Sequence, residues 1–245
     1  MPTSTRSRIT LRIILALCLT AGAAQAQVPQ PAAPAETPHR QLAPGFTSRP
    51  AASRLVIVPA DMELFSISAG GVTEPRADWT EAAQKHFKTA LLARPELGRN
   101  VSELTVAQVD EFAEIVALHR AVADSVFIHH SQSHLKLPTK AGRLDWSLGD
   151  VVRPLKARTG ADYALFTWVR DSYASGERKA AIVAMALLGA FTLGGEQVAY
   201  ASLVDLETGR IVWFNDLQRM SGDLREPSAA AETVEALLKG FPRPQ

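Results

Sequence analysis

Three histidines near the middle of the chain have the residue type and spacing for metal chemistry. They are His129, His130 and His134, and His119 precedes them. If a helix continued through this stretch, His130 and His134 would share one face at a spacing that can bind zinc. However, no Glu lies between them to act as a general base, and Ser131-Gln132-Ser133 is typical of a helix end. We expect structural roles and keep a metal-dependent hydrolase at the three histidines as the alternative.

Other catalytic patterns are missing from the sequence. No serine stands in a Gly-x-Ser-x-Gly turn, and Ser172 has no flanking glycines. Gly189, Gly194 and Gly195 are not spaced as a phosphate-binding loop. The carboxylates lie where caps or turns are expected, which is their usual structural position: Asp145, Asp150, Asp162, Asp171 and Asp205. We therefore predict no enzyme activity, no cofactor and no resident metal.

The amino terminus has the pattern of a secretory signal peptide. Arg6, Arg8 and Arg12 precede an apolar run over residues 13–19, and small residues follow as far as Ala24-Gln25-Ala26. The run is too short for a membrane-spanning helix. We predict a signal peptide over residues 1–26, cleaved in the A-x-A site of Ala24 and Ala26 before Gln27. The predicted location is the periplasm.

The single cysteine, Cys18, lies inside the predicted signal peptide. A bacterial lipoprotein signal needs a small residue before its cysteine, and Leu17 is large, so we do not expect a lipid anchor. The mature chain would have no disulfide and no cysteine metal site. Basic and acidic residues are nearly balanced, at 26 and 25. This balance argues against a nucleic-acid partner.

The remaining chain predicts a tether followed by one domain. Residues 27–52 are rich in Pro and Ala and contain few large apolar side chains, so we predict a flexible linker there. Residues 53–245 predict a single α/β domain of mixed α+β type, in which helices pack on one sheet that includes a C-terminal β-hairpin. The expected strands are residues 55–59, 163–169, 198–205 and 210–217. The expected helices begin near residues 78, 105, 145 and 228, with a capping box at Asp78 and a C-cap at Gly160.

One segment, residues 180–193, is apolar on every side when drawn as a helix. A surface helix normally has a polar face. Three readings stay open: a buried helix between two strands, a helix that docks on a partner protein or another copy, and peripheral contact with a membrane. An uncovered apolar helix would mark an interaction surface. The candidate partner surface combines this segment with the end of the preceding strand: Arg170, Asp171, Tyr173, Met185, Leu188 and Phe191.

The carboxy-terminal half resembles a group of bacterial envelope proteins. The resemblance lies in Thr159-Gly160-Ala161-Asp162-Tyr163-Ala164-Leu165 and in the hairpin that contains Asp205-Leu206-Glu207-Thr208-Gly209-Arg210-Ile211-Val212-Trp213. The group includes the curli secretion lipoprotein CsgG, the penicillin-binding-protein activator lipoproteins and the amino-terminal domain of TolB. The match lies mainly in residues 159–213. It implies an α/β domain that binds other envelope proteins or assembles into rings, without catalysis.

Together these observations predict a non-catalytic periplasmic accessory protein. Its expected partner is a protein of the envelope or of a secretion system, bound near residues 180–193. Self-association as an oligomeric envelope assembly subunit is a second hypothesis. The alternating amphipathic hairpins of a β-barrel pore are absent from the sequence, so a CsgG-like channel is not expected.

Overall fold

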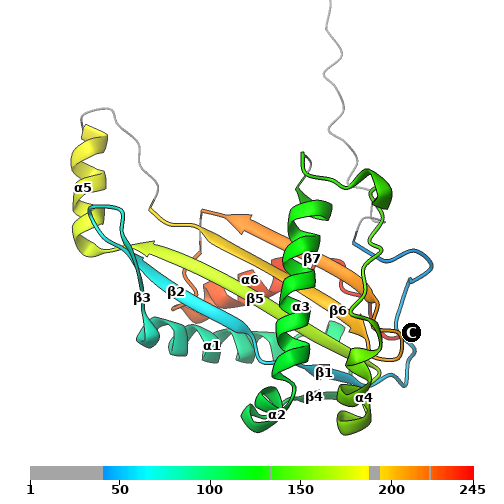
Figure 1. Cartoon of the computed structure of the whole chain (residues 1–245). Helices are drawn as coiled ribbons and strands as arrows, with labels where there is room; N and C mark the ends of the chain where they lie inside the picture. Colours follow the sequence, from blue (N-terminus) through cyan, green and yellow to red (C-terminus); the bar gives the residue numbers. More distant parts are fainter. Residues whose placement is uncertain (1–40, 133, 188–193, 221) are drawn as a thin grey trace, which may run out of the picture. The chain divides into compact units, whose positions relative to one another are not determined.

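The computed structural model describes residues 41–132, 134–187, 194–220 and 222–245 (Figure 1). The predicted signal peptide and its cleavage residues Ala24, Ala26 and Gln27 lie outside the described residues, as do Leu188 and Phe191. Within the described part of the chain, no helix is both long enough and apolar enough to cross a membrane.

The described residues form one mixed sheet of seven strands. The long central strand is β5 (Tyr163–Ala174). One edge of β5 pairs in parallel with β1 at its beginning and with β2 at its end, and the other edge pairs antiparallel with β6. The outer strands are β4 beside β1, β3 beside β2 and β7 beside β6. The bounds are β1 Leu55–Ile57, β2 Asp61–Ile67, β3 Thr73–Pro75, β4 Val101–Glu103, β6 Gln197–Asp205 and β7 Ile211–Arg219.

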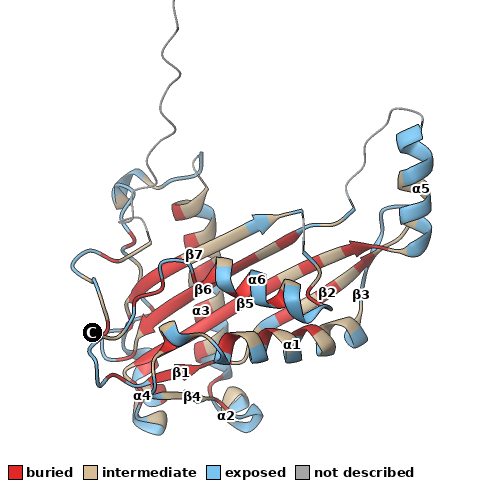
Figure 2. Ribbon diagram, turned by 180° about the vertical axis from the view of Figure 1, so that it is seen from behind, coloured by how far each residue is buried: buried red, intermediate tan, exposed pale blue. Residues whose placement is uncertain are grey.

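Helices cover both faces of the sheet (Figures 1 and 2). Helices α1 (Ala77–Leu92) and α6 (Pro227–Leu237) lie on one face, while α3 (Ala113–Val126) crosses the other. The remaining helices are α2 (Val106–Glu111), α4 (Arg153–Thr159) and α5 (Gly176–Leu187). Short 3₁₀ turns occupy Pro95–Leu97, Pro138–Lys140 and Gly149–Val152, and a π-helical turn spans Phe127–Ser131. The predicted mixed α/β class with a C-terminal hairpin is confirmed.

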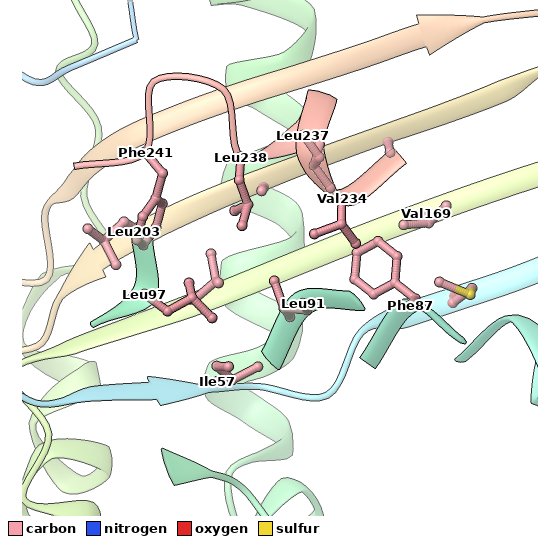
Figure 3. Close-up of a cluster of buried hydrophobic side chains, with 14 of the residues drawn as sticks. Ile57, Phe87, Leu91, Leu97, Val169, Leu203, Val234, Leu237, Leu238 and Phe241 are labelled. Carbon is pink, nitrogen blue, oxygen red and sulfur yellow. The ribbon is translucent and has the colours of Figure 1, made fainter. Parts of the chain in front are cut away.

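Two apolar cores lie on the two faces of the sheet. Between the sheet and helices α1 and α6, Phe87 and Leu91 pack near Val234 and Leu237 (Figure 3). On the other face, residues of α3 and α4 pack with Phe166 and Tyr200 of the sheet. Side chains alternate between the faces along a strand. Consequently Leu165 and Val169 of β5 belong to the first core, whereas Ala164 and Phe166 belong to the second.

The predicted linker boundary at residue 52 needs correction, because residues 41–52 pack on the domain. Leu42 forms an antiparallel β-bridge with Trp213, and the Ala43 amide donates to the Val212 carbonyl over 2.9 Å. This pairing covers part of the outer edge of β7. Arg49 is buried and donates to three backbone carbonyls, those of Pro242, Glu96 and Leu97. The backbone and Arg49 provide the hydrogen bonds of this arm, and Leu42, Ala43 and Phe46 pack on the first core.

Several element boundaries also differ from those predicted. The helix expected from residue 105 breaks at Phe112 into α2 and α3, and Thr105 provides a capping box with Gln108 at its start. The helix expected from residue 145 becomes a 3₁₀ turn followed by α4, because Pro154 is tolerated only near a helix start. No side chain caps α1, where Asp78 pairs with Arg76 instead. The C-cap at Gly160 is confirmed, with φ at 67°.

Candidate functional site

Helix α5 is an exposed apolar helix that extends from the end of the sheet (Figure 2). None of its residues from Gly176 to Leu187 is buried. Val183 is 62% exposed, Met185 is 42% exposed and Leu187 is 84% exposed. Successive residues of a helix point in directions about 100° apart, so Val183 and Leu187 share one side of the helix and Met185 lies on the opposite side. The reading of residues 180–193 as a buried helix is therefore wrong for residues 180–187.

The base of α5 is attached to the turn between β2 and β3. The Ser175 amide donates to the Ile67 carbonyl over 2.9 Å, and the Ser175 hydroxyl accepts from the Arg178 amide over 3.1 Å. The Arg178 guanidinium also donates to the Ser68 carbonyl, over 3.3 Å. These bonds hold only the first turn of the helix. The apolar residues after it extend beyond this support.

The chain returns to the sheet beside the point where α5 begins. The Ala174 amide donates to the Gly194 carbonyl over 2.6 Å, and the Ser172 amide donates to the Glu196 carbonyl over 3.0 Å. A Cβ atom on Gly195 would lie 1.9 Å from the Ser172 carbonyl oxygen. Only glycine allows this close approach of the two backbone segments. The residues that precede and follow the segment 176–193 are thus bonded to each other at one end of the sheet.

Part of the predicted partner surface is wrong, because Asp171 and Tyr173 are buried. They are only 2% and 8% exposed. The sequence pattern predicts a strand that ends at Val169, whereas β5 continues to Ala174 and its odd-numbered side chains point toward α1 and α6. Arg170 lies on the opposite face and pairs with Asp61, with 2.7 Å between Arg170 Nη2 and Asp61 Oδ1. Met185 is the predicted surface residue that the structure places on an exposed apolar surface.

Asp171 is the centre of a buried polar network. The Tyr173 hydroxyl and the Gln197 amide both donate to Asp171 Oδ2, the second over 2.5 Å. The Tyr173 oxygen accepts in turn from the Leu224 amide over 2.7 Å. Burial raises the pKa of Asp171 to about 6, against the opposing effect of its hydrogen bonds from Tyr173 and Gln197.

The network continues through Gln197 to β7 and α6. Gln197 Oε1 accepts from Arg219 Nε over 2.8 Å and from the Thr233 hydroxyl over 3.1 Å. Arg219 also donates to Thr233. The burial of Gln197 could not be predicted from the sequence, since a single glutamine at a strand start gives no signal of burial. Nothing in the sequence pairs it with Asp171 until the register of β5 and β6 is known.

A second cluster joins α3 to the opposite face of the sheet. The Arg120 and Arg170 guanidinium groups lie 4.4 Å and 5.0 Å from the Trp168 ring centroid. Asp61 accepts from both arginines. Cation–π contacts of this kind contribute about 1 kcal/mol each. These contacts hold α3 on the sheet.

The predicted histidine cluster does not assemble. The helix ends at Ser131, so His130 and His134 do not share a helical face; His130 is buried whereas His134 is exposed. His129 Nδ1 lies 2.9 Å from the Leu135 carbonyl oxygen. Among the described residues, no group of three or more His, Cys, Asp or Glu side chains is arranged to hold a metal ion. The hydrolase hypothesis therefore has no geometric support from His129, His130 and His134.

No protein-family model matches the chain, and no curated protein matches it significantly. Solved bacterial structures resemble it distantly. The PelC dodecamer from Paraburkholderia phytofirmans is 14% identical, with 81% of this chain and 96% of that chain covered and a TM-score of 0.39. Lipoprotein GNA1162 from Neisseria meningitidis is 14% identical, with 76% and 94% covered and a TM-score of 0.32.

The LpoB C-terminal domain from Salmonella enterica is 13% identical to this chain. The alignment covers 73% of this chain and 88% of that domain, with a TM-score of 0.29. The specific resemblance to CsgG and TolB stays a prediction.

Proposed function

We propose that this protein is a non-catalytic accessory protein of the bacterial cell envelope, and that it binds a partner protein through α5 in the periplasm. The observation that supports the proposal is the exposure of Val183 and Leu187 on one side of the helix and of Met185 on the opposite side. Monomeric proteins rarely leave such an apolar surface uncovered. The partner surface consists of residues 180–187 and is called the α5 surface below.

The energetics favour a covered α5 surface. An isolated helix of twelve residues is marginally stable in water, and packing normally provides most of a helix's stability. Full burial of a Val, Met or Leu side chain contributes about 1.5–3 kcal/mol. Burial of Val183, Met185 and Leu187 by a partner would therefore contribute on the order of 5 kcal/mol to binding before the costs of association.

A protein groove suits this helix better than a lipid bilayer. A helix that lies in a membrane interface has a strongly polar face, which residues 180–187 lack. If the helix entered the bilayer end-on, its last backbone carbonyls would lose water without gaining partners. An apolar groove in a protein covers the side chains and can also satisfy the helix end. Exposed Glu177 and Lys179 at the base would then form a polar rim.

Site-specific photo-crosslinking in cells tests the proposal. A photoreactive benzoylphenylalanine replaces Val183 in one variant and Val106 in a matched control, since Val106 is also an exposed valine, at 78%, but lies on α2. The expected result is a discrete adduct with one envelope protein from position 183 and none from position 106. The captured protein, once purified, should bind the purified accessory protein directly. Equal crosslinking from both positions, or none from position 183, would refute the assignment.

Two further outcomes would redirect the proposal. An adduct between two copies of this chain, with a mass that rises with concentration in sedimentation, would identify an oligomeric assembly subunit instead. Lipid adducts from position 183, with flotation on vesicles that Leu187→Ser abolishes, would identify a membrane anchor instead. Either result would overturn the assignment of α5 to a heterologous protein partner.

A further inference from the structure

Asp171 occupies a junction between α5 and the body of the domain. Asp171 of β5 lies directly opposite Gln197 of β6 in the sheet register. The chain between these two residues leaves the sheet, forms α5 and returns. Any change in the pairing of Asp171 with Gln197 therefore acts at the base of the α5 surface.

One carboxylate links several elements at this junction. Asp171 accepts from Tyr173 within β5 and from Gln197 on β6. Tyr173 accepts from the Leu224 amide in the loop between β7 and α6, and Gln197 accepts from Arg219 on β7 and Thr233 on α6. Tyr173 and Gln197 both donate to Asp171 and both accept bonds from the other elements. Loss of the Asp171 interactions would therefore loosen β5, β6 and the β7–α6 loop together.

The donors to Asp171 are neutral, which makes its charge costly to bury. In the described part of the chain, no hydrogen bond or ion pair joins Asp171 to a cationic side chain. The nearby cationic side chains make their hydrogen bonds with other groups, while the Arg225 charge acts on Asp171 only through space. Arg219 bonds Gln197 and Thr233, and Arg225 pairs with Asp223 while its guanidinium lies 4.4 Å from the Tyr173 ring centroid. Asp223 adds a second negative charge, which disfavours ionised Asp171 further.

We propose that Asp171 is a proton-operated latch on the α5 surface. In the closed form the neutral carboxyl keeps Asp171 of β5 bonded to Gln197 of β6. In the open form, which the ionised carboxylate favours, β5 and β6 separate at this end. The link to partner binding rests on the function proposed above, whereas the latch itself is a property of the isolated protein. Opening would admit water to the carboxylate and release the base of α5 from its fixed position.

The direction of the pH effect follows from the two states of the junction. The pKa of Asp171 is about 6 in the closed form, against an ordinary value of 3.8 that we assign to the hydrated, open form. A group that binds its proton more tightly in the closed form stabilises that form at low pH, and this stabilisation is lost as pH rises through about 6. Between pH 5 and pH 8 the open population should increase about tenfold.

Hydrogen exchange of the purified protein at pH 5 and pH 8 tests the latch. After correction for intrinsic exchange rates, the wild type should show about tenfold lower protection at pH 8 in residues 171–176, 194–199 and 219–226. Asp171→Asn, which is always neutral, should lose this difference. The control Asp150→Asn, at an exposed carboxylate near the other end of β5, should retain it. Protection that is independent of pH in the wild type, or still dependent on pH in Asp171→Asn, would overturn the latch.

A second variant keeps the test decisive if Asp171→Asn does not fold. Tyr173→Phe removes a donor to the ionised carboxylate, so the midpoint of the pH effect should move upward. An unchanged midpoint would also overturn the latch. Exchange is measured without a partner, so its result does not depend on the proposed function. Crosslinking from position 183 at both pH values then tests whether the latch controls binding. If protection differs between pH 5 and pH 8 but the crosslinking yield does not, the latch does not control partner binding.

Discussion

The imidazole of His119 stacks on the ring of Phe166, with ring centroids 3.8 Å apart and planes inclined by 11°. His119 Nε2 also lies 2.6 Å from the hydroxyl of the fully buried Ser202. Helix α3 thus places a polar side chain inside the apolar layer between itself and the sheet. Burial lowers the pKa of His119 to about 3, with a further contribution from the Arg120 charge.

This histidine should make the domain sensitive to acid. The folded protein holds His119 neutral, whereas the unfolded chain takes up a proton near pH 6.5, so stability falls as pH drops below that value. Between pH 7 and pH 5 the contribution of His119 should reduce the free energy of unfolding by about 2 kcal/mol. Urea denaturation at the two pH values should show that His119→Gln loses this part of the pH dependence. His134→Gln, at an exposed site, should retain it, and identical pH profiles for wild type and His119→Gln would contradict the prediction.

Arg49 should be required for the ordered arm. Its guanidinium donates to three carbonyls from two other segments, and replacement by Met would leave these buried acceptors without partners. We expect Arg49→Met to lower the free energy of unfolding by about 2–4 kcal/mol. Arg99→Met, at an exposed arginine, should change it by less than about 0.5 kcal/mol. Denaturant titration of both variants provides the comparison, and equal losses would show that the three bonds contribute little.

Gly209 should tolerate no side chain. A Cβ atom there would lie 2.1 Å from the Gly149 carbonyl oxygen, and the residue has φ at 71°. Gly45 has a similar φ of 81° but open space around it, so it separates the conformational cost from the steric cost. We expect Gly45→Ala to cost about 1 kcal/mol and Gly209→Ala at least about 3 kcal/mol. Thermal unfolding checks both values, and similar costs for the two variants would mean that the loop at Gly149 moves aside readily.

The α5 surface should accept polar substitutions without loss of stability. Val183→Ser and Leu187→Ser remove side chains that the domain does not bury, so the free energy of unfolding should change by less than about 0.5 kcal/mol. Binding of a fluorescent apolar dye such as ANS should fall at the same time. Leu165→Ser, at a fully buried position of β5, should instead destabilise by several kcal/mol. A large loss of stability in Val183→Ser would indicate that α5 packs on the domain in solution.

The sequence predicted the regular elements better than the site. The β-branched run at Leu55, the hairpin around Gly209 and the apolar face of the last helix each depend on local patterns, and each was found where expected. The sequence patterns did not predict strands β2, β3 and β4. Strand β2 mixes polar and apolar residues because only alternate positions are buried, and β3 and β4 are short edge strands with little apolar content.

The sequence by itself determined the strand that begins at Leu55, the hairpin around Gly209 and the last helix, because these elements depend on neighbours along the chain. It also determined that residues 180–187 have no polar face. Only the tertiary structure decided that α5 stays exposed while Asp171 and Tyr173 are buried. Burial depends on which other elements lie above a residue. Here α1 and α6 cover one face of β5, and the described structure places no element over α5. The pairing of Asp171 with Gln197 likewise required the register between β5 and β6, which no local pattern in either strand specifies.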